Sequence, residues 1–180
     1  MQKIFKIISV GILILLGFLF IIGIISSAET NITSSIVIER PSNLVWQKIC
    51  DVNKMSDWRT NIAGPKLLNT EPLEKNSIIQ YYWQNSNKPI IQEEKVVEFK
   101  PEKILSLRLA GDPEKMLILN MVVSFEIKPL LDGTTELTSN ISYKSKSFLT
   151  RIYNQVIMRR NLSRDNELTL KNLKHIIERS

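Results

Sequence analysis

The stretch LILNMVVSFEIKPLLDGTTELTSNISY, residues 117–143, decides the fold of this chain. Apolar side chains recur at every second position on both sides of the pair Asp132-Gly133. A period of two places these side chains on one face of a strand, and an Asp-Gly pair is a strong hairpin signal. The stretch therefore predicts two long antiparallel strands, each with one buried face and one polar face.

Shorter runs before this hairpin also have strand character. Residues 104–110 alternate, with leucines on one face and Ser106 and Arg108 on the other. Residues 77–83 and 89–99 are rich in β-branched and aromatic side chains and are separated by a turn cluster. A further β-rich run covers residues 35–39. Together these runs predict a curved antiparallel sheet of about six or seven strands.

Helical spacing flanks the strands. Pro41 stands near the start of a predicted helix that reaches Asp51, and a second short helix is expected over residues 54–58. From Ser147 apolar residues recur at helical spacing to the chain end, without Pro or Gly, which predicts one long carboxy-terminal helix. The whole pattern predicts an α+β domain whose curved sheet wraps around this helix.

An apolar segment precedes the domain. Residues 7–25 carry no charge, and as a helix they would span about 30 Å, close to the hydrocarbon thickness of a bilayer. Lys3 and Lys6 lie before the segment, and the first basic residue after it is Arg40. The positive-inside rule then places the amino terminus in the cytoplasm and the domain outside it. We therefore expect a single-pass membrane protein.

A cleaved signal peptide is the alternative to a retained anchor. Ser26, Ser27 and Ala28 are small residues of the kind found at a signal peptidase site, but the apolar run exceeds the roughly 7–15 residues usual in a signal. We favour the anchor. The expected divisions are residues 1–28 for the anchor, 29–34 for a short polar linker and 35–180 for the folded domain.

Composition and charge narrow the possible partners. The net charge is +6, and the basic residues are spread out apart from an enrichment in the last third. No nucleic-acid partner is expected for a domain outside the cytoplasm. Cys50 is the only cysteine and His175 the only histidine, so we expect no disulfide, no structural metal site and no cofactor. A basic helix near a membrane could contact anionic head groups, although a solvated helix face explains the same charges.

Several short stretches, in order, resemble the START-like superfamily, also called the SRPBCC or polyketide cyclase/dehydrase group. They are Ile36–Trp46, then Asp51 and Asp57-Trp58, then Glu98–Pro101 running into Ile104–Arg108, then Asp132–Leu137, and last Leu170–Glu178. The resemblance covers residues 34–179, essentially everything after the apolar segment. That segment is a departure from most of the group, whose members are soluble.

The resemblance implies a helix-grip fold with a mostly apolar pocket between sheet and long helix, in a group whose members bind lipids, polyketides or other hydrophobic small molecules. Such a pocket needs apolar walls and a few polar groups. Ser139 and the hydroxyls of Tyr81 and Tyr143 could fix a polar group of the ligand; for each candidate, the alternative is an ordinary core position. The candidate lining residues are Tyr81, Trp83, Val97, Phe99, Leu107, Leu109, Met121, Val123, Phe125, Ser139, Ile141, Tyr143, Tyr153 and Val156.

Two other functions stay open beside ligand binding. An enzyme of the polyketide cyclase or dehydratase type, acting in the same cavity, would need an ionisable side chain inside it. Glu93, Glu94 and Glu98 lie on a predicted strand, where we expect exposed carboxylates, and we expect Arg108 to point outward and His175 to lie on the helix surface. The sequence has no nucleophile elbow, so we assign no catalytic residue. A ligand-free interaction domain is the third possibility.

Overall fold

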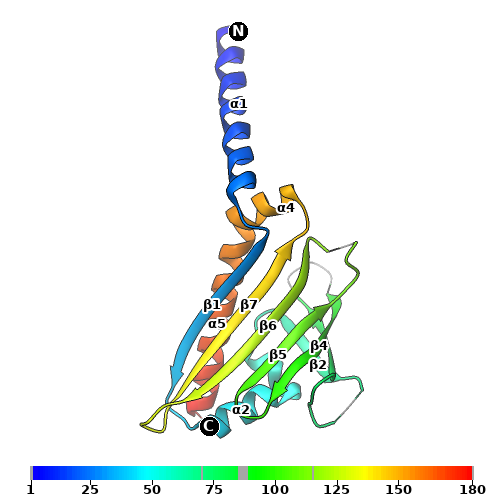
Figure 1. Ribbon diagram of the computed structural model, residues 1–180, viewed down its shortest axis with the longest axis vertical. Helices are drawn as coiled ribbons and strands as arrows, with labels where there is room; N and C mark the ends of the chain where they lie inside the picture. Colours follow the sequence, from blue (N-terminus) through cyan, green and yellow to red (C-terminus); the bar gives the residue numbers. More distant parts are fainter. Residues whose placement is uncertain (1, 70, 85–88, 115, 180) are drawn as a thin grey trace.

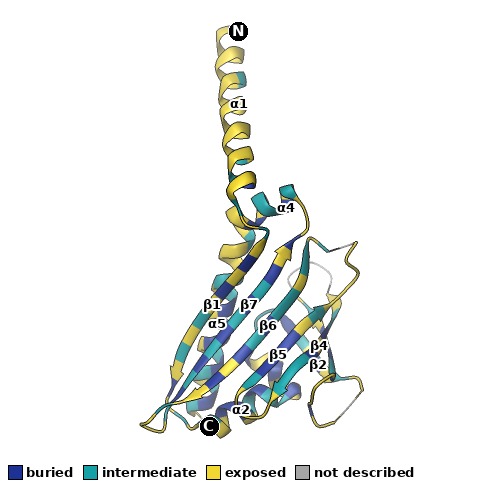
Figure 2. Ribbon diagram, in the orientation of Figure 1, coloured by how far each residue is buried: buried dark blue, intermediate teal, exposed yellow. Residues whose placement is uncertain are grey.

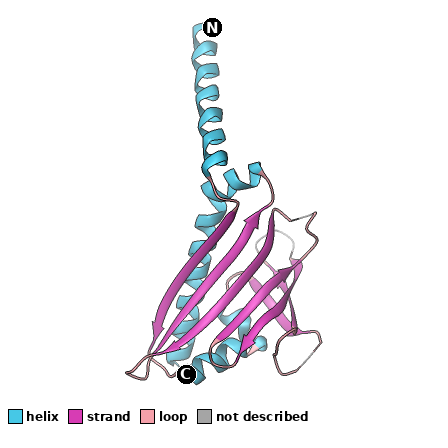
Figure 3. Cartoon of the chain, viewed as in Figure 1, coloured by secondary structure: helices cyan, strands magenta, loops and turns pink. Residues whose placement is uncertain are grey.

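The computed structural model describes residues 2–69, 71–84, 89–114 and 116–179. One seven-stranded antiparallel sheet, in the order β1-β7-β6-β5-β4-β3-β2, curves beside a long helix, α5, that lies along one of its faces (Figures 1 and 3). The predicted α+β architecture is therefore confirmed. The elements in chain order are α1 (Gln2–Ile25), β1 (Glu29–Ile38), α2 (Ser42–Cys50), the 3-10 turn η1 (Val52–Lys54), α3 (Met55–Trp58), β2 (Ile62–Leu67), β3 (Ile78–Trp83), β4 (Ile90–Lys100), β5 (Ile104–Ala110), β6 (Ile118–Pro129), β7 (Thr135–Ser145), α4 (Phe148–Tyr153), the π-helical turn η2 (Asn154–Met158) and α5 (Arg159–Arg179).

Strands β6 and β7 form the long hairpin that the sequence predicts. Phe125 pairs with Ser139 and Val123 pairs with Ile141, and all these side chains are buried. Gly133, in the turn, has a φ of 78°, a conformation that glycine adopts without steric cost. The period of two thus places one face of the hairpin in the core.

Residues 29–34 are not a linker, in contrast to our expectation. They form the first half of β1, which pairs with β7 along its whole length. Thr30 and Ile32 face the core, while the alternate positions expose polar side chains, so a half-buried strand has the composition of a linker. As a result, only residues 26–28 separate α1 from the sheet.

Strand β2 is also absent from the sequence-based prediction. Gly64 and Pro65 lie inside it, and both residues weaken strand propensity. The strand tolerates them because it is the edge of the sheet and because its pairing with β3 shifts between Ala63 and Lys66.

The carboxy-terminal helix is bent rather than continuous. The π-helical turn η2 joins α4 to α5, and α4 runs sideways at the base of α1 (Figure 1). Leu149 and Tyr153 on α4 and Val156 on η2, whose helical spacing would suit a buried stripe, are exposed, since α4 packs against α1. Further along, Leu170 and Leu173 are buried under the sheet as predicted.

The core lies between the sheet and the helices, as the dark positions in Figure 2 show. Tryptophans fix the two short helices to the sheet: Trp58 packs edge-on against Phe125 with ring centroids 5.6 Å apart, and Trp46 packs against Phe99 with ring centroids 5.3 Å apart. In contrast, α1 is exposed along most of its length (Figure 2). It is long and apolar enough to cross a membrane.

Candidate functional site

Three side chains, Arg59, Glu94 and Tyr81, form a buried charged cluster between the end of α3 and strands β3 and β4. The Arg59 guanidinium, just after α3, donates two hydrogen bonds to the Glu94 carboxylate on β4, at 2.6 and 2.8 Å. The hydroxyl of Tyr81, on β3, donates a third bond to Glu94 at 3.0 Å. The guanidinium also lies 5.5 Å from the centre of the Tyr81 ring. A bidentate pair of this kind fixes both the distance and the plane of its two groups.

Water is largely excluded from this cluster, which determines its protonation. The side chains of Arg59 and Glu94 are only 11% and 4% exposed. Burial lowers the pKa of Arg59, but the charge and hydrogen bonds of Glu94 outweigh it, and the net shift is upward. Burial, reinforced by the charge of Glu94, raises the pKa of Tyr81, so its hydroxyl stays protonated and remains a donor.

Two further polar bridges connect the sheet to the helical segment. Ser139, on β7, donates to the side-chain oxygen of Asn166 on α5 at 2.7 Å. Tyr143 donates to the side-chain oxygen of Asn154 on η2 at 2.5 Å, and the Asn154 amide donates to Thr30 on β1 at 2.8 Å. The hydroxyls expected to fix a ligand are therefore bonded to protein side chains. A ligand would have to share these bonds or replace them.

Three buried side-chain donors in the described part of the chain lack a hydrogen-bond partner: Trp58 Nε1, Ser145 Oγ and Arg151 Nε. The indole nitrogen of Trp58 makes no hydrogen bond there, although the whole residue is inaccessible to solvent. Of these three donors, only that of Trp58 belongs to the apolar core cluster, where its ring packs against Phe125. Leaving a buried donor unpaired costs about 1–3 kcal/mol, and such a group calls for an explanation.

The structure distributes the predicted lining residues over three environments. The fully buried ones face the core, where the apolar members pack into one cluster. The half-buried ones lie around its rim or, for Val97, on the outer face. The exposed ones lie on α4 and η2. The buried candidates are Tyr81, Leu107, Val123, Phe125, Ser139, Ile141 and Tyr143. The half-buried candidates are Trp83, Val97, Phe99, Leu109 and Met121. The exposed candidates are Tyr153 and Val156.

The expected inward position of Val97 is wrong for a local reason. The pairing of β4 with β5 shifts between Val96 and Glu98, so the strand carries one extra residue there. A bulge of this kind reverses the alternation on one side of it. Val97 therefore lines a shallow depression on the outer face together with Arg108, which points outward as predicted.

The sequence analysis did not predict the charged cluster. We expect an exposed Glu94 from the sequence, and the structure buries it. The alternation carried no signal for this position, because Val97 and Phe99 were expected to face inward and Glu94 has the opposite parity; the bulge between Val96 and Glu98 is what places Glu94 on the inner face. The position of Arg59 carried no signal either, since it follows a short helix and its partner lies on a different element.

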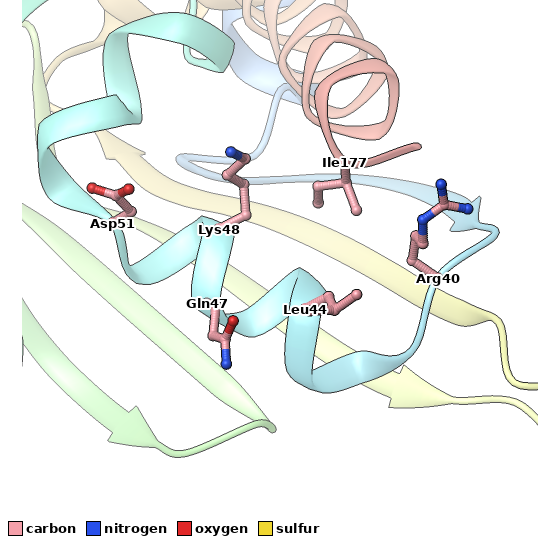
Figure 4. A pocket seen from close by; sticks show the side chains of 6 residues that line it. All are labelled: Arg40, Leu44, Gln47, Lys48, Asp51 and Ile177. Carbon is pink, nitrogen blue, oxygen red and sulfur yellow. The ribbon is translucent and has the colours of Figure 1, made fainter. Parts of the chain in front are cut away.

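A surface pocket of about 320 Å³ lies elsewhere, between α2 and the end of α5 (Figure 4). The charged side chains of Arg40 and Asp51 stand beside the apolar side chains of Leu44 and Ile177 in its lining. Arg40 donates to the backbone carbonyl of Glu178 at 2.8 Å and so helps hold the end of α5. The pocket contains none of the lining residues predicted from the sequence.

No group of three or more potential metal ligands (His, Cys, Asp or Glu) gathers within the described ranges. Cys50, on α2, is half-buried, and burial raises the pKa of its thiol to about 12. A raised pKa in the folded state stabilises the fold below the unfolded pKa of about 9, and this contribution is lost as pH rises toward 12.

We therefore expect Cys50 to react with a thiol reagent at pH 8 more than about tenfold more slowly in the folded chain than in urea, because the thiolate is the reacting species. Absorbance of the released chromophore from a disulfide reagent measures both rates. Equal rates would contradict the burial of this thiol.

The curved seven-stranded sheet and the long helix along its face define a helix-grip domain. Residues 29–178 match the family described as "Polyketide cyclase / dehydrase and lipid transport", and the chain belongs to this family. The resemblance found in the sequence is thus confirmed. Comparison with curated protein sequences gives no match.

Solved structures show the same fold at low sequence identity. The Zhui aromatase/cyclase from Streptomyces sp. R1128 is 12% identical with a TM-score of 0.61, over 82% of this chain and 96% of its own. Major latex-like protein 151 from Panax ginseng is 11% identical with a TM-score of 0.66, over 83% and 97%. Truncated norcoclaurine synthase from Thalictrum flavum is 11% identical with a TM-score of 0.65, over 85% and 96%. At these identities the likeness establishes the fold alone.

Proposed function

We propose that this chain is a membrane-tethered protein that binds a hydrophobic small molecule or a lipid between the sheet and α5. Membership of a family whose description includes lipid transport supports the ligand class. The length and apolar character of α1 support the tether. The observation that carries the proposal is the unpaired indole nitrogen of Trp58 in the apolar core; the next residue in the chain, Arg59, belongs to the buried charged cluster.

The unpaired donor suggests which kind of ligand fits. An acceptor atom on the ligand would remove the cost of leaving the Trp58 nitrogen unbonded. The neighbouring Leu107 and Phe125 belong to the same apolar core as Trp58 and would contact an apolar body. We therefore propose a ligand with a hydrocarbon or ring body and a hydrogen-bond acceptor, such as a carbonyl or hydroxyl oxygen, at one end.

The buried ion pair fits a binding role better than a purely structural one. Desolvating two charges offsets most of their attraction, so a buried pair is a poor source of stability compared with apolar packing. Groups with strongly perturbed pKa values concentrate at functional sites. The Arg59–Glu94–Tyr81 cluster would give the interior a fixed polar end at which the ligand is oriented.

The test compares two tryptophan variants of the full chain. Wild type, Trp58→Phe and Trp46→Phe are purified from membranes in mild detergent, and bound compounds are extracted and identified by mass spectrometry. Both tryptophans pack on a phenylalanine of the sheet, but only Trp58 presents a buried unpaired donor. We expect one compound to co-purify with wild type and Trp46→Phe and to fall about tenfold in Trp58→Phe. Absence of any stoichiometric compound from the wild type would refute the proposal.

We propose that α1 is retained as the anchor, with the amino terminus in the cytoplasm and the domain outside it. The contact of α1 with α4 supports retention, since cleavage after Ala28 would strip α4 of its packing partner. Mass spectrometry of the intact chain from membranes distinguishes the two fates. A chain that begins at residue 29 would show that α1 is a signal peptide.

Catalysis is the second candidate function. The buried ionisable side chains of Glu94 and Tyr81 favour it over an interior that serves for packing alone. An enzyme acting on a hydrophobic substrate needs an ionisable group inside the fold, and this cluster supplies one. Both oxygens of Glu94 are occupied by Arg59, however, which limits proton transfer. If the compound that co-purifies with Glu94→Gln differs chemically from the one in the wild type, the enzyme is favoured; an unchanged compound favours binding alone.

A further inference from the structure

The contact between α1 and α4 locates part of the domain at the depth of the bilayer. The Phe20 and Phe148 rings lie 5.5 Å apart. Gly23, one turn further along α1, is buried, and a Cβ atom there would clash with the Phe148 ring. The helices are therefore in close contact over the last turns of α1, at the base of that helix in Figure 1.

The length of the apolar run then limits how far α4 can stand from the membrane. Residues 7–25 supply about 30 Å of helix, about the thickness of the hydrocarbon core, so the whole run is needed to cross it. Phe20 lies five residues before Ile25, or about 7 Å along the axis. A side chain that packs on Phe20 must lie at the edge of the hydrocarbon or inside it.

The outward surface of α4 and η2 is apolar, which suits this depth. Leu149 is 75% exposed and Val156 is 52% exposed, and Tyr153 and Ile157 are also exposed. These residues lie within nine positions of one another, beside a helix that is itself apolar. Tyrosine is enriched at the boundary of hydrocarbon and head groups, and clustered exposed apolar side chains mark an interaction surface.

A basic cleft continues this surface along the helical segment. Arg159, Arg160 and Arg164 line it together with polar side chains and one acidic residue, Glu167, in a volume of about 500 Å³. Arg160 follows Val156 by four positions and precedes Arg164 by four, so the arginines share the face that exposes Val156. The cleft has the charge that attracts the phosphate groups of anionic lipids.

We propose that α4 and η2 lie in the interface of the bilayer, with the exposed apolar side chains inserted and the arginine cleft over anionic head groups. The domain is then held against the membrane, because α1 leads into β1 after three residues and also packs against α4. This inference rests on the membrane tether proposed above but not on the internal ligand. An amphipathic helical segment with arginines beside apolar side chains is typical of such interfacial surfaces.

The test measures the membrane depth of single labels on the full chain. In a Cys50→Ser background, a polarity-sensitive fluorophore is attached at Leu149→Cys and the protein is reconstituted in vesicles of phosphatidylcholine and phosphatidylglycerol. Leu131→Cys, in the exposed β6–β7 turn at the far end of the sheet, is the matched control. Leu13→Cys, within α1, reports the anchor. We expect quenching by a lipid-borne quencher to be several-fold stronger at 149 than at 131.

A second comparison tests the head-group contact. Raising the share of phosphatidylglycerol is expected to increase quenching at position 149, and the double change Arg160→Gln with Arg164→Gln is expected to abolish that increase. Lys171→Gln, an exposed cation further along α5, should leave the increase unchanged. An increase that survives the loss of both arginines would remove the anionic-lipid part of the proposal.

The outcomes separate the inference from the tether on which it rests. Strong quenching at position 13 with water-like emission at 149 would overturn the docking surface and leave the anchor in place. Water-like emission at both positions would overturn the two together. Strong quenching at 13 and 149, with none at 131, supports the docked arrangement.

Discussion

Glu94→Gln is expected to lower the free energy of unfolding by about 3 kcal/mol, because it leaves the Arg59 charge buried without a counter-charge. The two hydrogen bonds from Arg59 and the one from Tyr81 all end on this carboxylate, so one substitution disturbs the entire cluster. Urea unfolding of the full chain in mild detergent, followed by circular dichroism, measures the change. The variant keeps the size of the side chain, so a lost cavity contact cannot account for the effect.

Glu93→Gln is the matched control for this prediction. Glu93 is the adjacent carboxylate, and its side chain accepts one hydrogen bond from Gln80 at 2.9 Å. We expect a change below about 1 kcal/mol. The double change Arg59→Met with Glu94→Leu should recover most of the stability, since apolar residues of similar volume often replace a buried pair without loss. A Glu94→Gln variant as stable as Glu93→Gln would show that the pair is not desolvated in the folded protein.

Trp58→Ala is expected to cost about 3–5 kcal/mol, the usual range for removing a buried aromatic side chain. Trp58 is completely buried, and its ring packs edge-on against Phe125 of β6, so its loss opens a cavity between α3 and the sheet. The same unfolding experiment measures it.

Trp58→Phe separates packing from hydrogen bonding at this position. The smaller ring keeps most of the contact with Phe125 and removes a donor that has no partner, so we expect a cost below about 1.5 kcal/mol. A cost equal to that of Trp58→Ala would mean that the indole nitrogen makes a hydrogen bond of its own in the folded chain. Together with ligand retention, this pair of variants tells whether Trp58 acts through packing or through its donor.

The predicted and unpredicted parts of the fold differ in how local their signals are. The β6–β7 hairpin was predictable because alternation and the Asp132-Gly133 turn both act within a few residues. The strand character of residues 29–34 was not, because it depends on β7, more than a hundred positions away. The bend at η2 was not predictable either, because α4 turns away from the axis of α5 to pack against α1, which is distant in the chain.

The candidate site shows the same division. Buried apolar positions such as Leu107 and Phe125 follow from strand periodicity and were predicted to face inward. The ion pair was not predictable, because Arg59 and Glu94 lie 35 positions apart on elements whose packing no local pattern describes. Carboxylates are also rarely buried, and the bulge that turns Glu94 inward has no signal in the strand's alternation.

By itself, the sequence determined the α+β architecture, the family and the apolar amino-terminal helix, because periodicity, turn residues and length act locally along the chain. Only the tertiary structure decided which polar side chains meet in the interior and which face of α4 is left open beside α1. These contacts join residues distant in the chain, and their free energy depends on desolvation and geometry that exist only after the elements have packed.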